Sequence, residues 1–231
     1  MAKQVGFYAG ITTAILTVIT LGLALLAVPI AGANCPSDCI DYPYLDTADQ
    51  FPRDYAWMIP AILLTLAYLI LMVTIHASAA PERKIVSQIG VALAVMAAII
   101  LIGDYYVQFS VVPVSVKNGE TEGIALLTQY NPHGIFIALE EAGYLLMSLS
   151  FLFMAGVFAA EKRVLVMIRW VFILGFVIPI VALIIISAIY GLERLDRFEV
   201  IILSVDWLVL LVNGILLSRV FSTTAADQPP S

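Results

Sequence analysis

Six long apolar runs occupy almost the whole chain. They cover roughly residues 6–30, 56–77, 86–112, 134–160, 164–190 and 199–221. A bilayer core is about 30 Å thick and a helix rises about 1.5 Å per residue, so about 20 apolar residues can cross it. Backbone groups in lipid must be hydrogen-bonded within their own segment, which favours helices. The sequence therefore predicts an all-α fold, an integral membrane bundle of six transmembrane helices within residues 1–222.

The composition disfavours most other classes of protein. The chain is 62% hydrophobic and 12% charged, with a mean hydropathy of +1.02, whereas a soluble domain is about 45–50% apolar and about 25% charged. A net charge of −6 argues against a nucleic-acid partner, which would need a basic patch. The expected partner is the lipid bilayer, and a homo-oligomer or a larger membrane complex stays open. Residues 223–231 are predicted to be a disordered tail.

Lysine and arginine placement predicts the orientation, because cytoplasmic loops are enriched in both. A cytoplasmic N-terminus puts seven of these residues inside and four outside, which favours a multi-pass protein of the cell membrane with both termini cytoplasmic. The inside set is Lys3, Arg83, Lys84, Lys162, Arg163, Arg169 and Arg219, and the outside set is Arg53, Lys117, Arg194 and Arg197.

A cleaved signal peptide is an alternative reading of the first run. Lys3, the apolar run and the sequence "AGA" at 31–33 resemble such a peptide. The apolar part of a signal peptide has only about 7–15 residues, so the length favours a retained span. Cleavage would leave five spans and the same remaining topology.

Cys35 and Cys39 are the two cysteines, and both fall in the first outer loop of this topology. An oxidising outer compartment permits a disulfide there. A C-x-x-x-C pair without a third ligand nearby is a poor zinc signal. A local disulfide and two free thiols both stay open.

Four acids interrupt the apolar runs: Asp104, Glu140, Glu141 and Asp206. An ionisable residue inside a span is costly and by default marks a functional site. At helical rise, Glu140 and Asp206 lie about 10 Å below the outer ends of their spans, and Asp104 about 13 Å. We therefore expect all of them at a similar height in the outer half of the bundle.

Helical spacing adds further residues to this cluster. Gln108 shares a face with Asp104, and Tyr144 shares one with Glu140, whereas Glu141 is turned about 100° away from Glu140. No lysine or arginine is expected at this depth, with the sole exception of Arg53 at the start of the second span. The predicted ligand or proton site consists of Asp104, Gln108, Glu140, Glu141, Tyr144 and Asp206.

Three functions are compatible with such a site. The first is a small transporter or ion-coupled carrier. The second is a non-catalytic membrane partner or sensor subunit, in which the acids form hydrogen bonds between helices. The third is an intramembrane enzyme acting on a lipid or quinone. The sequence contains no Walker loop, G-x-G-x-x-G, G-x-S-x-G or H-E-x-x-H motif, which weighs against an enzyme.

The sequence identifies no cofactor or metal. His76 is expected near the inner face and His133 near the outer face, so the two cannot bind one haem between them. The Glu-x-x-His pairs of di-iron bundles are absent. A haem held by two histidines is therefore disfavoured, and the metal question stays open.

Overall fold

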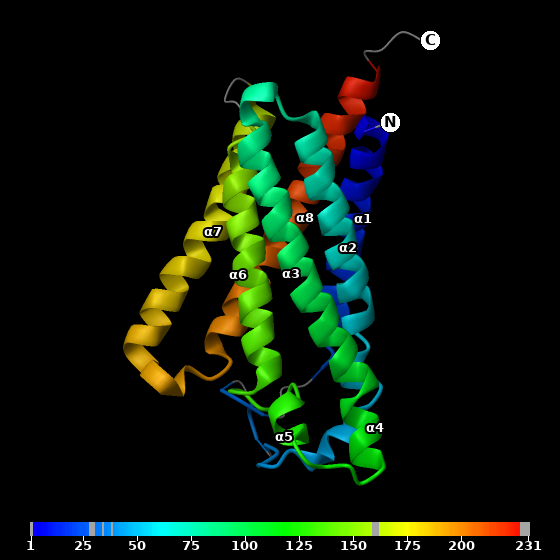
Figure 1. Cartoon of the computed structure of the whole chain (residues 1–231), viewed down its shortest axis with the longest axis vertical. Coiled ribbons are helices and arrows are strands. Elements are labelled where there is room, and N and C mark those ends of the chain that lie inside the picture. The colour runs from blue at the N-terminus through cyan, green and yellow to red at the C-terminus, as the bar shows by residue number, and fades with distance from the viewer. Residues whose placement is uncertain (1, 28–30, 34, 38, 159–161, 227–231) are drawn as a thin grey trace.

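Six long helices form the molecule, and every other element is short (Figure 1). The computed structural model describes residues 2–27, 31–33, 35–37, 39–158 and 162–226, of which 223–226 by backbone alone, and this part contains no strand. All six helices are long and apolar enough to cross a membrane. They are α1 (Ala2–Ala24), α2 (Met58–Ser78), α3 (Lys84–Ser110), α6 (Ile135–Ala155), α7 (Arg163–Tyr190) and α8 (Arg197–Ala226).

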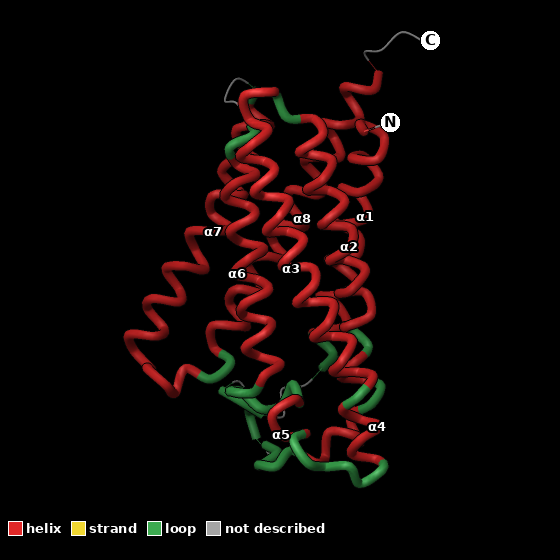
Figure 2. The backbone as a smooth tube through the Cα atoms, viewed as in Figure 1, coloured by secondary structure: helices red, strands yellow, loops and turns green. Residues whose placement is uncertain are grey.

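The long connections gather at one end of the bundle (Figure 2). We call this the loop end; it contains the described residues of 25–57, 111–134 and 191–196. The opposite end, which we call the terminal end, contains both chain ends and the short connections after α2 and α6 (Figure 1). The short elements are η1 (Leu45–Gln50), η2 (Arg53–Tyr55), η3 (Pro81–Arg83), α4 (Val112–Lys117), α5 (Ile124–Leu127) and η4 (Gly191–Arg194).

Two helix ends differ from the sequence-based boundaries. Helix α1 stops at Ala24 rather than near residue 30, and residues 28–30 lie outside the described residues. Helix α8 continues to Ala226, so the first four residues of the predicted disordered tail are helical. No proline interrupts this stretch before Pro229, so nothing in the sequence forces the helix to stop earlier. Residues 227–231 lie outside the described part of the chain.

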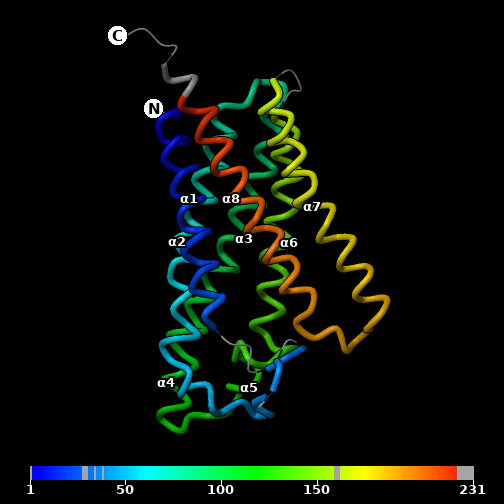
Figure 3. Tube along the Cα trace, turned by 180° about the vertical axis from the view of Figure 1, so that it is seen from behind, coloured from blue at the N-terminus to red at the C-terminus, as the bar shows by residue number. Residues whose placement is uncertain are grey.

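The helices pack in a closed ring. Helix α1 lies between α2 and α8, α2 contacts α3, α3 contacts α6, and α7 contacts both α6 and α8. Helix α6 also touches α8 across the bundle, which brings together the two helices that carry most of the buried acids. Helix α7 is peripheral, and its second half leans away from the other helices (Figures 1 and 3).

Glycines allow a close approach of the backbones of α1 and α8. A Cβ atom on Gly10 would lie 2.7 Å from the carbonyl oxygen of Gly214, and one on Gly214 would lie 2.8 Å from that of Gly10. Small residues at matching positions let two helix backbones come this close. A larger side chain at either position would push the helices apart.

We expect Gly10→Ala to lower the thermal stability of the detergent-purified protein, and Gly22→Ala to maintain or raise it. Both changes favour the helix by roughly 0.5–1 kcal/mol, but only Gly10→Ala overpacks an interface, at a cost of about 1–3 kcal/mol. A Cβ on Gly22 meets nothing within 4 Å, so it is the matched control. Equal melting temperatures for the two variants would contradict the close approach of α1 and α8.

Candidate functional site

A cavity of about 170 Å³ opens at the loop end of the bundle. We call it the acidic pocket because four carboxyl side chains line it, Asp54, Glu140, Asp196 and Glu199. Sites for drug-sized ligands measure roughly 300–1,000 Å³, so this pocket is small for an organic molecule. It has room for a small ion or several water molecules.

Glu140 and Glu199 form a carboxyl pair at the inner side of the acidic pocket. Glu140 on α6 is 1% exposed and Glu199 on α8 is 8% exposed. Both line the pocket, and their carboxyl groups lie close enough to interact. Ionised carboxylates only accept hydrogen bonds, so a hydrogen bond between the two groups needs a proton on one of them. The pair is therefore a candidate proton-binding site shared by two helices.

A chain of buried hydrogen bonds leads from this pair into the bundle. The Tyr105 hydroxyl donates to Glu140 Oε1 at 2.6 Å and lies 2.8 Å from the Tyr144 hydroxyl oxygen. Trp207 Nε1 donates to the Tyr144 hydroxyl oxygen at 2.9 Å. Because Tyr105 uses its proton on Glu140, Tyr144 donates to Tyr105. All donors in the chain thus point toward Glu140.

Asp206 lies deeper in the bundle than Glu140, the residue at which this hydrogen-bonded chain begins. Ser148 Oγ donates to Asp206 Oδ1 at 2.8 Å, and Asp206 Oδ2 is buried without a partner. Ser148 is eight residues beyond Glu140 on α6, or about 12 Å along the helix. The expectation that Asp206 and Glu140 share one height is therefore wrong. The first turn of α8 already lies at the level of Glu140, so Glu199 occupies the place expected for Asp206.

Sequence reasoning left Glu199 out of the candidate site. Its seven-residue spacing from Asp206, and from there to Asn213, places all three on one face of α8. That spacing was the available signal, but a residue at the edge of an apolar run looks like an ordinary helix-end acid. Only the packing of α8 against α6 shows that its carboxyl group is buried.

Glu141 points away from the acidic pocket and forms an ion pair with Arg194 of η4. The guanidinium also lies over the ring of Phe198, 5.7 Å from its centroid. The expectation that no cation reaches these acids is thus wrong for Glu141. Arg194 belongs to the connection between α7 and α8, outside the apolar runs, and its side chain reaches the Glu141 carboxylate on α6.

Asp104 and Gln108 line a different cavity, on the other side of Tyr105 and Phe136. This second cavity lies between α3, α5 and α6 and measures about 370 Å³. Asp104 is nevertheless close enough to Glu140 for the two carboxyl groups to interact electrostatically. Of the six predicted residues, the structure thus joins Glu140 and Tyr144 in one hydrogen-bonded chain and places Asp104 and Gln108 together at the second cavity. Glu141 and Asp206 each have other partners.

Asp54 closes one wall of the acidic pocket. Its carboxylate accepts hydrogen bonds from Arg53 Nε at 2.5 Å and from the Tyr130 hydroxyl at 3.0 Å. Burial and the nearby Tyr55 and Asp54 raise the pKa of Tyr130, so this hydroxyl keeps its proton and stays a donor. Asp54 is thereby held by two partners at this wall of the pocket.

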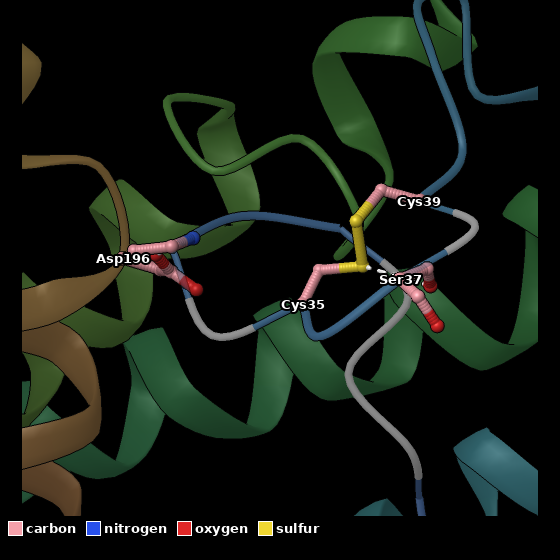
Figure 4. Close-up of a disulfide and its surroundings, with 5 residues drawn as sticks. Cys35, Ser37, Cys39 and Asp196 are labelled. Carbon is pink, nitrogen blue, oxygen red and sulfur yellow. Dashed lines mark hydrogen bonds between the residues drawn. A yellow bond between two sulfur atoms is a disulfide. The ribbon is translucent and has the colours of Figure 1, made fainter.

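The disulfide loop closes the opposite wall. Cys35 and Cys39 form a disulfide, and Asp196 lies near it (Figure 4). The Ala33 backbone N–H donates to Asp196 Oδ1 at 2.9 Å. Gly32 has a φ of +77°, and a Cβ there would overlap the Asp196 carboxylate. A glycine is therefore required where the loop meets the start of α8.

The remaining sequence candidates and comparisons add no further chemistry. His76, near the terminal end of α2, contacts Ser87 Oγ at 2.8 Å, whereas His133 is exposed just before α6 at the loop end. Among the described residues, no group of three His, Cys, Asp or Glu side chains could hold a metal ion. No protein-family model, curated protein or solved structure matches the chain significantly.

Arg194→Gln should destabilise the protein more than Arg194→Gln combined with Glu141→Gln. The single change leaves a buried carboxylate without its cation, whereas the double change removes both charges. We expect a coupling free energy of about 0.5–3 kcal/mol from the double-mutant cycle, measured by thermal unfolding in detergent. Arg83→Gln, at an exposed position, is the control. Strictly additive effects would show that the pair contributes nothing.

Proposed function

We propose that the chain is an integral membrane protein with six spans, its loop end outside the cell and both termini in the cytoplasm. Seven of the eleven lysines and arginines lie toward the terminal end, in keeping with the excess of positive charge in cytoplasmic loops. The Cys35–Cys39 disulfide at the loop end suits an oxidising outer compartment. Both supports are independent of the acids inside the bundle.

Within this topology we propose a small proton-coupled carrier. The observation that carries the proposal is the close pair of buried Glu140 and Glu199, which lines the acidic pocket at the loop end. A buried acid pair that holds one proton between its members can gain or lose a proton with little rearrangement. The acidic pocket supplies or receives that proton.

The Tyr105–Tyr144 chain offers the route into the bundle. In the observed orientation, a proton arriving at the Tyr144 oxygen displaces its hydroxyl proton to Tyr105, which passes its own proton to Glu140. Rotation of the two hydroxyls reverses the direction. Asp206 interacts electrostatically with Tyr144 and is the nearest buried acid on the inner side of this chain, so we assign it the role of inner proton acceptor.

A second candidate is a non-catalytic membrane subunit in which the acids only join helices. The ion pair of Glu141 with Arg194 and the hydrogen bond of Ser148 to Asp206 favour it at those two positions. The pairing of Glu140 with Glu199 favours the carrier, because two acids facing each other are a poor choice for a purely structural contact. The third function, an intramembrane enzyme acting on a lipid or quinone, is still a prediction from the sequence.

Glu140→Gln and Glu199→Gln should each reduce potential-driven proton uptake into proteoliposomes by about a hundredfold or more, the loss typical of removing a proton-transfer group. A pH-sensitive dye inside the liposomes measures the uptake. Glu120→Gln, at an exposed loop-end position, is the control. Folded Glu140→Gln and Glu199→Gln proteins with wild-type proton uptake would exclude the carrier.

Tyr105→Phe and Tyr144→Phe should slow the same uptake by about tenfold or more while both glutamates remain, since each change removes one hydroxyl from the relay. The carboxylic-acid band of the pair in infrared spectra should persist in both variants. Tyr8→Phe, at a 59% exposed position on α1, controls for loss of a tyrosine. Unchanged rates would mean that protons bypass the tyrosines.

A further inference from the structure

The second cavity, which we call the lateral cavity, opens on the side of the bundle. Its volume of about 370 Å³ falls within the range of small-molecule sites. Its rim consists of exposed apolar side chains, among them Ile99 at 68% and Ile135 at 45% exposure. A Cβ on Gly103, also at this rim, would meet nothing within 4 Å. In a bilayer this opening would face the lipid tails, so a ligand would enter from the membrane.

Two buried polar side chains without partners line this apolar cavity. Asp104 is 6% exposed and Gln108 is 0% exposed. Asp104 Oδ2 and both amide atoms of Gln108 are buried and make no hydrogen bond of good geometry, although the Gln108 amide lies near the Tyr55 hydroxyl. Buried polar atoms are almost always satisfied, and leaving one unpaired costs about 1–3 kcal/mol. Three such atoms on adjacent turns of one helix, at the wall of a cavity, indicate a missing hydrogen-bonding ligand.

The unpartnered atoms define the head group that fits. Asp104 Oδ2 and Gln108 Oε1 are acceptors, and among the described residues that line the cavity there is no lysine or arginine. An ammonium group offers three donors and a charge opposite to a carboxylate. An oxygen next to the ammonium would accept from Gln108 Nε2. The apolar walls require an aryl or alkyl body rather than a hydrated metal ion.

We propose that the lateral cavity binds a lipophilic amine, with its ammonium group between Asp104 and Gln108. The inference rests on the proposed function, in which this amine is the cargo that exchanges with the proton of Glu140 and Glu199. Phe136 lines both the lateral cavity and the acidic pocket, so its side chain forms part of the wall between the two sites.

Electrostatics couples the amine site to the proton site. The carboxyl groups of Asp104 and Glu140 interact across the space between α3 and α6. A cation bound at Asp104 offsets the repulsion that its carboxylate exerts on a negative charge at Glu140. Amine binding therefore promotes proton release from the pair, and by reciprocity proton binding weakens amine binding. This coupling has the sign that an exchange of amine for proton requires.

The test compares three probes with one apolar body: 4-phenylbutylamine, 4-phenylbutan-1-ol and 4-phenylbutyrate. Binding to the detergent-solubilised full chain is measured by calorimetric titration at neutral pH. We expect the amine to bind at least about tenfold more tightly than the alcohol, in line with the stronger hydrogen bonds of a charged donor, and the carboxylate not to bind.

Two variants test the site itself. Asp104→Asn should weaken amine binding about tenfold or more by removing the charge, and Gly103→Leu should block the opening while leaving the carboxyl group intact. Glu122→Gln, at an exposed position on the loop end, is the control and should bind the amine like wild type. Equal affinity for amine and alcohol, or wild-type amine binding by Asp104→Asn, would overturn the proposal.

Failure of this inference and failure of the proposed function give different results. Equilibrium binding in detergent needs no proton movement, so it judges the amine site alone. Proton uptake by wild-type proteoliposomes, measured with and without amine inside them, judges the Glu140 and Glu199 pair. Amine binding without proton uptake in either condition would retain the amine site and reject the carrier, whereas proton uptake without amine binding would reject only the amine site.

Discussion

The contact between Glu140 and Glu199 constrains the rest of the structure more than any other interaction. A single ionised carboxylate buried in an apolar bundle is very costly unless it is paired or neutralised. Here two carboxyl groups from α6 and α8 lie close together, and a proton on one of them removes their mutual repulsion. The direct packing of α6 on α8 brings the two groups together, and the tyrosine chain contacts Glu140.

The other buried acids have different partners, and the partner of each acid indicates its role. Arg194 neutralises Glu141, and Ser148 satisfies one oxygen of Asp206. Asp104 has a bare oxygen at an apolar cavity. Acidic side chains thus supply a structural ion pair, a polar helix contact and, in our proposal, a binding position within one bundle. Composition alone treats these acids as equivalent, because it carries no information on their partners.

The loop end of the bundle acts as the wall of the acidic pocket. Arg53 and Tyr130 hold Asp54, and the disulfide loop holds Asp196 through the Ala33 N–H. The Tyr130–Asp54 and Ala33–Asp196 contacts join residues from different connections, so the loops pack against one another at this end of the bundle. This packing keeps the pocket small, which suits water and protons better than a large organic molecule.

The sequence by itself determined that the chain forms long apolar helices. Runs of about 20 apolar residues leave the backbone no other way to satisfy its hydrogen bonds in an apolar setting, and the structure contains six helices at those places. Helical periodicity also separated Glu140 from Glu141 correctly, because a rotation of about 100° per residue is a local property of the helix. These conclusions needed no knowledge of which helices are neighbours.

Only the tertiary structure decided which acids meet. The depth of each acid was estimated from the residue at which its apolar run begins in the sequence. Helix α8 begins deeper in the bundle than this estimate assumes. Glu199 rather than Asp206 therefore faces Glu140. The partner of Glu141 lies in a connection whose path depends on the packing of α7 and α8. Contacts between residues about 50–60 positions apart depend on helix order and offset, and periodicity within one helix does not encode either of them.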